Sequence, residues 1–201
     1  MLPPAAWLVA GQLAVMGVPG QYDSQLRAAL ESYLALAPMR VEFRYELAQG
    51  DFHRDTTGTM FLFDHDGFRL ELWDKVYGSD GSSLYLYDRN TRQTVIDSLR
   101  WPEVNLWLRL LHGELPVGTM VTPAGRAASG AVLWQLRHDR PMWEAVVAID
   151  TAHRSLREVQ LDETGGLSHH LRLAPPAPWD GQHPRALMTL KDLGGKRLDL
   201  R

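Results

Sequence analysis

The sequence contains no cysteine, and this absence alone excludes several kinds of chemistry. Without thiols the chain forms no disulfide, binds no metal through thiolates and has no cysteine nucleophile. A strong charge of one sign is also missing, since 21 Lys and Arg stand against 24 Asp and Glu, for a formal net charge of -3. The basic residues are scattered among acidic ones, which argues against a nucleic-acid-binding surface.

The motifs of common enzyme and cofactor sites are missing as well. The chain has no Gly-x-Ser-x-Gly elbow, P-loop, dinucleotide-binding fingerprint or His-Glu-x-x-His pair. His169 and His170 are neighbours, so on a strand they point to opposite faces and cannot jointly bind one metal ion. The segment 64–66, Asp-His-Asp, has cation ligands but is first of all typical of a polar turn. We therefore expect no catalytic residue, no metal and no cofactor.

Long apolar runs are scarce, and the one near the N-terminus is short. Residues 5–18 are apolar except for one Gln, which matches the apolar region of a signal peptide and is too short for a membrane span. Small residues at 18–20 predict cleavage before Gln21, although no Lys or Arg precedes the run. We expect residues 1–20 to be a signal peptide and the protein to be periplasmic. A buried helix is the alternative.

What the chain does have is a strictly alternating segment, Met39–Leu47, in which apolar and charged residues take turns. Such alternation places the apolar side chains on one face of a strand and the charged ones on the other. Asp-Gly pairs at 66–67 and 80–81 mark turns. Further strands are expected near 57–64, 67–74, 75–79, 83–88, 92–98, 131–138, 142–149, 155–162 and 167–173, with 185–191 and 196–200 as closing strands.

Two helices accompany these strands. Residues 22–36 have a helical apolar period, a second helix is expected over 102–113, and 122–130 is expected to be a loop. Many strands with few helices predict one α+β domain over 21–201, with helices on one face of a curved antiparallel sheet and a hydrophobic cavity between. An ordinary filled core is the alternative. The expected cavity residues are Val41, Phe43, Tyr45, Met60, Leu62, Phe68, Leu70, Leu72, Trp107, Leu108 and Leu111.

Four segments carry a resemblance to a known family. Residues 58–62 (Gly-Thr-Met-Phe-Leu), 68–71 (Phe-Arg-Leu-Glu), 79–88 (Ser-Asp-Gly-Ser-Ser-Leu-Tyr-Leu-Tyr-Asp) and 93–95 (Gln-Thr-Val) resemble LolA, the periplasmic carrier of outer-membrane lipoproteins. The resemblance implies an incomplete β-barrel whose helical lid covers a cavity for acyl chains. It also implies a monomer that binds acyl chains of a lipoprotein or lipid and meets transfer proteins of the inner and outer membranes.

The chain departs from that family just before its Phe-Arg strand. The family has a Lys-Arg-Pro-like segment there, whose Arg helps to hold the lid closed, whereas residues 63–67 read Phe-Asp-His-Asp-Gly. A divergent carrier with another client is therefore the first hypothesis. A LolA-like sensor or protein-interaction module of the RseB type, without transfer activity, is the second. A lipid that co-purifies with the protein favours the first, and a stoichiometric protein partner without lipid favours the second.

Overall fold

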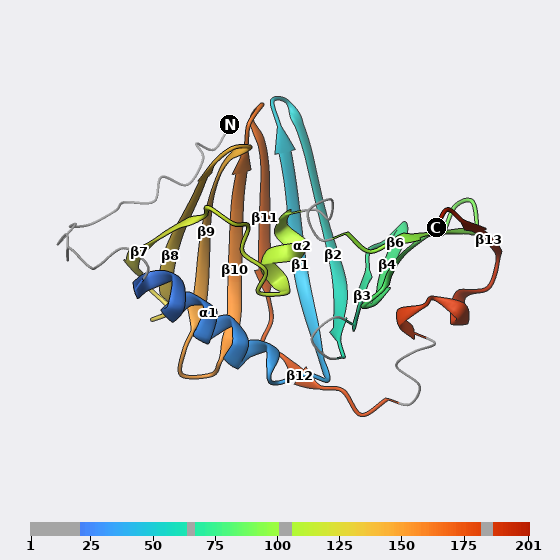
Figure 1. Cartoon of the computed structure of the whole chain (residues 1–201), viewed down its shortest axis with the longest axis horizontal. Coiled ribbons are helices and arrows are strands. Elements are labelled where there is room, and N and C mark those ends of the chain that lie inside the picture. Colours follow the sequence, from blue (N-terminus) through green and yellow to red (C-terminus); the bar gives the residue numbers. More distant parts are fainter. Residues whose placement is uncertain (1–20, 64–66, 101–105, 182–186) are drawn as a thin grey trace.

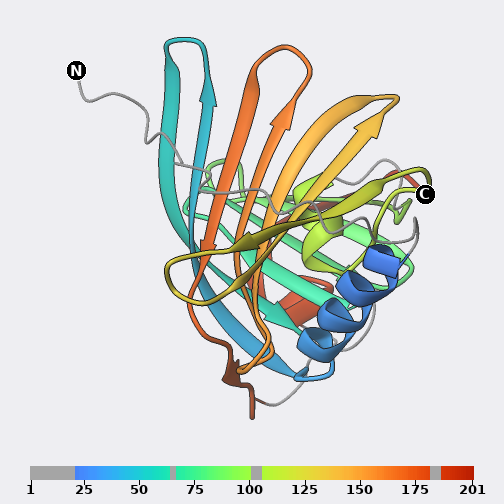
Figure 2. The same ribbon diagram turned by 90° about the vertical axis from the view of Figure 1, so that its left-hand side faces the viewer.

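A computed structural model of the chain describes residues 21–63, 67–100, 106–181 and 187–201. Within them one strongly curved sheet of 13 strands carries α-helices on its concave side (Figures 1 and 2). The predicted α+β class and the curved, unclosed sheet are thereby confirmed. The predicted signal peptide and the acidic segment 64–66 lie outside the described residues, as does the start of the second helix.

The helices are α1 (Gln21–Leu34) and α2 (Leu106–Leu111). The strands are β1 (Met39–Gln49), β2 (Phe52–Leu62), β3 (Gly67–Glu71), β4 (Lys75–Asp80), β5 (Ser83–Asp88), β6 (Gln93–Ser98), β7 (Met120–Arg126), β8 (Val132–Asp139), β9 (Met142–Asp150), β10 (Ser155–Glu163), β11 (Leu167–Leu173), β12 (Ala177–Pro178) and β13 (Lys196–Asp199). A short 3₁₀ helix, η2 (Lys191–Leu193), precedes β13.

The sheet joins two meanders edge to edge. Its strand order is β13-β6-β5-β4-β3-β2-β1-β11-β10-β9-β8-β7, and β12 pairs with the start of β1. The antiparallel pairing of β1 with β11, from Phe43 opposite Leu173 to Gln49 opposite Leu167, connects the meanders. All neighbours are antiparallel except β13, which runs parallel to β6. This arrangement brings residues more than a hundred positions apart onto one continuous concave face.

Strand β1 shows how the alternating sequence sets the two faces. Met39, Val41 and Phe43 are buried while the charged residues between them are exposed, as the alternation predicts. Phe43 lies opposite Gly58 of β2, where an added Cβ would come within 2.4 Å of the Phe43 ring. Gly58 therefore leaves the space that this aromatic ring fills.

The Ser-Asp-Gly motif forms the turn between β4 and β5. Gly81 has a φ of 85°, which favours glycine. The Asp80 carboxylate accepts hydrogen bonds from the backbone N–H groups of Ser82 and Ser83, at 3.2 and 3.0 Å. The motif thus has the structural role that its turn chemistry predicts.

Helix α1 lies across the concave side of the sheet (Figure 2), and its apolar side belongs to the core cluster there. Leu26, Leu30 and Tyr33 are at most 2% exposed, because they share the side of the helix that faces the sheet. Gly113, just after α2, lies against Leu30 and Leu34 of α1. The two helices therefore meet over the same apolar layer.

Two segments differ from the sequence-based expectations. The expected loop at 122–130 is largely strand β7, which pairs with β8 through a bulge between Pro123 and Gly125. Pro123 fits in β7 because β7 is an edge strand. A backbone N–H that points away from β8 has no neighbouring strand to bond, so the missing N–H of proline costs no hydrogen bond there. The expected strand at 185–191 is wrong over its described part. Residues 187–193 form helical turns, since Leu187, Leu190 and Leu193 recur every third residue, a helical spacing.

The segment 187–201, called the C-terminal cover below, packs on the convex face of the sheet (Figure 1). Its Leu190 joins a second apolar cluster with Val76, Tyr85, Tyr87 and Ile96. The sequence alone leaves open whether the two tyrosines cover the convex face or contact a partner, and here the C-terminal cover buries them.

Candidate functional site: the concave interior

The structure brings the predicted cavity residues together between the helices and the sheet. Eight of them are at most 4% exposed and belong to one apolar cluster, while Tyr45 and Leu72 are half-buried beside it. Trp107 lies on α2, but its side chain is outside the described part. The eight are Val41, Phe43, Met60, Leu62, Phe68, Leu70, Leu108 and Leu111. We call the whole cluster the concave interior.

The second meander supplies eleven buried residues of the concave interior, and the sequence-based list leaves all of them out. Buried and exposed residues alternate along β8 to β11 much as they do along β1. Their inward positions could therefore have been predicted from the two-residue period of the sequence. What could not be read is that β11 pairs with β1 and continues the same face. The additional residues are Trp134, Leu136, Trp143, Ala145, Val147, Ile149, Leu156, Val159, Leu161, Leu171 and Leu173.

Toward the tips of the hairpins the concave face becomes polar. The Tyr45 hydroxyl is hydrogen-bonded to Nδ1 of His169 at 2.7 Å, and Nε2 of His169 lies 3.1 Å from a Glu163 carboxylate oxygen. His169 is only 4% exposed, and burial lowers its pKa because water no longer stabilises the imidazolium. Burial also raises the pKa of Tyr45 to about 12. These three side chains connect β1, β11 and β10 at the end of the apolar layer.

His170 lies on the opposite face, as neighbouring strand positions require. It contacts Glu158 and lies 3.8 Å from Glu46, both on the outer side of the sheet. Among the described residues no group of three or more His, Asp or Glu side chains is placed to hold a metal ion.

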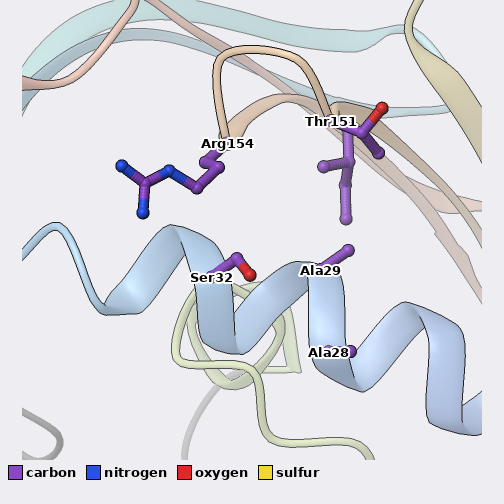
Figure 3. A pocket seen from close by; sticks show the side chains of 6 residues that line it. Ala28, Ala29, Ser32, Thr151 and Arg154 are labelled. Atoms are coloured by element: carbon purple, nitrogen blue, oxygen red, sulfur yellow. The ribbon is translucent and has the colours of Figure 1, made fainter.

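An open pocket of about 230 Å³ lies at one side of α1 (Figure 3). Ala28, Ala29 and Ser32 of the helix face Thr151 and Arg154 in the turn between β9 and β10. Ile149 also lines the pocket and belongs to the concave interior. The pocket therefore reaches from the surface to the apolar layer, at a place that the sequence-based list of residues does not include.

In the described part of the chain, neither helix combines the length and apolar character that spanning a bilayer requires.

Comparisons with known proteins find the fold but no close relative. No protein-family model matches the sequence, and no curated protein does. An uncharacterized conserved protein from Thermus thermophilus matches with a TM-score of 0.57 at 12% identity, over 87% of this chain and 99% of that one. A LolA superfamily protein from Nitrosomonas europaea matches with a TM-score of 0.47 at 8% identity, over 82% and 96%.

A putative outer membrane lipoprotein-sorting protein domain from Vibrio parahaemolyticus is also similar, with a TM-score of 0.45 at 9% identity, over 85% of this chain and 99% of that chain. At such identities these likenesses concern the fold alone. The likeness to the Thermus thermophilus protein extends over most of both chains and shows a shared fold.

Proposed function

We propose that this protein is an envelope protein that binds the acyl chains of a lipoprotein or lipid in its concave interior and shields them from water. The observation that carries the proposal is the make-up of that interior. A continuous apolar layer fills the concave side of a 13-stranded sheet, and helices α1 and α2 cover it in the described residues. Most of a helix's stability in a protein comes from packing of its apolar face, so the position of α1 and α2 depends on the layer beneath them.

The energetics of acyl-chain burial fit such a layer. Each methylene removed from water contributes about 0.8 kcal/mol, so a chain of about a dozen methylenes gains roughly 10 kcal/mol before the cost of opening the protein. The pocket beside α1 has about 230 Å³, below the roughly 300–1,000 Å³ of ligand pockets. Binding a whole chain therefore requires α1 and α2 to act as a lid that moves away from the sheet, with Ile149 at the point of entry.

The same proposal includes export, a monomeric state and handover to transfer proteins of the two membranes, without catalysis. Export predicts a mature N-terminus near Gln21, which N-terminal sequencing of protein purified from an envelope fraction measures. Intact Met1 in the cytoplasmic fraction would contradict the localisation. The acidic segment at 64–66 replaces the basic latch of the LolA family, so we propose a client other than that of LolA.

Native mass spectrometry of the full chain from an envelope fraction tests binding directly. We expect a mass increment that matches one or more acyl lipids or a lipoprotein, and its loss after delipidation. Reloading with a lipid of known mass should restore the increment. A lipid-free protein that takes up none of the acyl lipids offered would contradict the proposal.

A second function, a sensor or protein-interaction module, is favoured by a different observation. Val117, Met120 and Met142 are 98%, 49% and 54% exposed around edge strand β7 and the β8–β9 turn. An edge strand with apolar neighbours suits the addition of a partner's strand. A stoichiometric protein partner that is retained without lipid, and lost on Met120→Lys, would support this second function.

A further inference from the structure

The concave interior contains two buried hydrogen-bond donors that have no hydrogen-bond acceptor among the described residues. The Tyr33 hydroxyl of α1 and the indole N–H of Trp134 on β8 are both buried there, with their residues 0% and 5% exposed. A buried polar group without a partner costs free energy, and native proteins rarely keep one without a reason. Burial raises the pKa of Tyr33, so its hydroxyl keeps its proton and can donate.

The chemistry of these two groups says what would satisfy them. An indole N–H can only donate, and a protonated phenol donates as its stronger interaction. Hydrocarbon offers no acceptor, so a purely alkyl ligand would leave both groups unsatisfied. A carbonyl oxygen next to a long alkyl chain, as in an acyl ester or an acyl amide, supplies the acceptor within an otherwise apolar molecule.

We propose that the concave interior recognises the carbonyl group of its acyl ligand through the Tyr33 hydroxyl, which donates a hydrogen bond to an ester or amide oxygen. This inference rests on the proposed function and adds to it the chemical class of the bound group, a carbonyl ester or amide. The protein selects acyl esters and amides over ethers or alkanes of equal length, because only the carbonyl compounds satisfy the buried Tyr33 hydroxyl.

A matched position on the other side of the sheet serves as a control. Thr94 is 0% exposed and its hydroxyl also has no hydrogen-bond partner in the described residues. It lies opposite Tyr87, so it faces the convex side, away from the concave interior. Thr94→Val removes an unsatisfied buried hydroxyl without touching the proposed ligand site.

The experiment compares three probes of the same chain length on the delipidated full chain: a diacyl glycerol ester, the corresponding dialkyl ether and an N-acyl amide. Displacement of a fluorescent fatty acid measures each affinity, and thermal unfolding measures the stability of each unliganded variant. One hydrogen bond predicts that wild type binds the ester and the amide about fivefold to tenfold more tightly than the ether.

Tyr33→Phe should abolish this preference by weakening ester and amide binding, leave ether binding unchanged, and leave the unliganded protein at least as stable. Thr94→Val should keep the preference. Equal affinity of wild type for ester and ether, or a preference that survives Tyr33→Phe, would overturn the inference while the proposed function stands. Failure of wild type to bind any of the three probes would overturn the proposed function itself.

Discussion

The two faces of the sheet are covered in different ways. On the convex face the C-terminal cover is held by backbone pairing and by charge. Strand β13 pairs in parallel with β6, and Arg69, only 4% exposed, lies 2.7 Å from both Asp192 and Glu71. Where Met188 passes the sheet, a Cβ on Gly78 would lie 2.1 Å from the Met188 carbonyl oxygen. This cover is fixed to the sheet.

On the concave face, the buried side of α1 is built from Leu26, Leu30 and Tyr33. Apolar packing is non-directional, so an acyl chain can replace one apolar neighbour by another. The acyl chain of a lipid cannot replace an ion pair or the backbone hydrogen bonds between two strands in this way. Of the two covers, the concave one is therefore suited to exchange its contacts for a ligand.

The largest expected effect comes from placing a charge in the concave interior. Phe43→Glu should lower lipid affinity by more than tenfold and the free energy of unfolding by roughly 3–5 kcal/mol, because a carboxylate is driven among apolar side chains. Fluorescent-lipid binding and chemical denaturation measure the two quantities.

The matched control is Glu42→Lys, on the exposed face of the same strand, which should leave lipid affinity nearly intact. Phe43→Ala, which keeps the site apolar, serves if the charged variant does not fold. Equal losses of lipid binding for Phe43→Glu and Glu42→Lys would mean that the assignment of faces is wrong.

The next largest effect concerns the C-terminal cover. Arg69→Ala should lower the free energy of unfolding by about 2 kcal/mol, since Asp192 and Glu71 lose a buried partner but stay about one-third exposed. Hydrogen exchange over 187–201 should become faster, with lipid affinity unchanged. Arg89→Ala, which removes a more exposed contact to Glu71, should change stability by less than about 0.5 kcal/mol. Loss of lipid binding in Arg69→Ala would erase the distinction between the covers.

Hydrogen exchange compares the two covers in the unaltered protein. Amides over 106–113 should exchange faster than those over 39–47, and bound lipid should slow them by adding contacts under α2. Exchange over 196–199 should not respond to lipid. A single-Trp variant that keeps Trp107 should change its fluorescence on loading. Uniformly slow exchange that no lipid alters would favour the protein-interaction module over the carrier.

The smallest expected effect is a pH dependence at the polar end of the concave face. Because burial lowers the pKa of His169, the unfolded chain binds this proton more readily than the folded one. The stability contributed by neutral His169 is therefore complete above its ordinary value of 6.5 and is lost as pH falls below it toward the lowered folded pKa. Denaturation from pH 8 to 5 should show this loss in wild type and in His170→Gln, and a smaller one in His169→Gln.

Local periodicity determined the elements and the faces of this protein. The alternation at Met39–Leu47 is enough to place Val41 and Phe43 inward, because side chains of a strand point in turn to its two faces. The adjacency of His169 and His170 likewise separates them, and Asp80-Gly81 specifies its turn. Each of these outcomes depends on residues a few positions apart, so a single sequence contains the physical cause.

Only the tertiary structure decided what covers each face and which distant groups meet. The hydrogen bond of Tyr45 with His169 joins residues 124 positions apart, and the pair of Arg69 with Asp192 joins residues 123 apart. The edge position of β7 and the burial of Tyr85 likewise depend on neighbours from elsewhere in the chain. Local propensity does not specify which strands become neighbours, because long-range pairing follows from burying the most apolar surface of the whole chain at once.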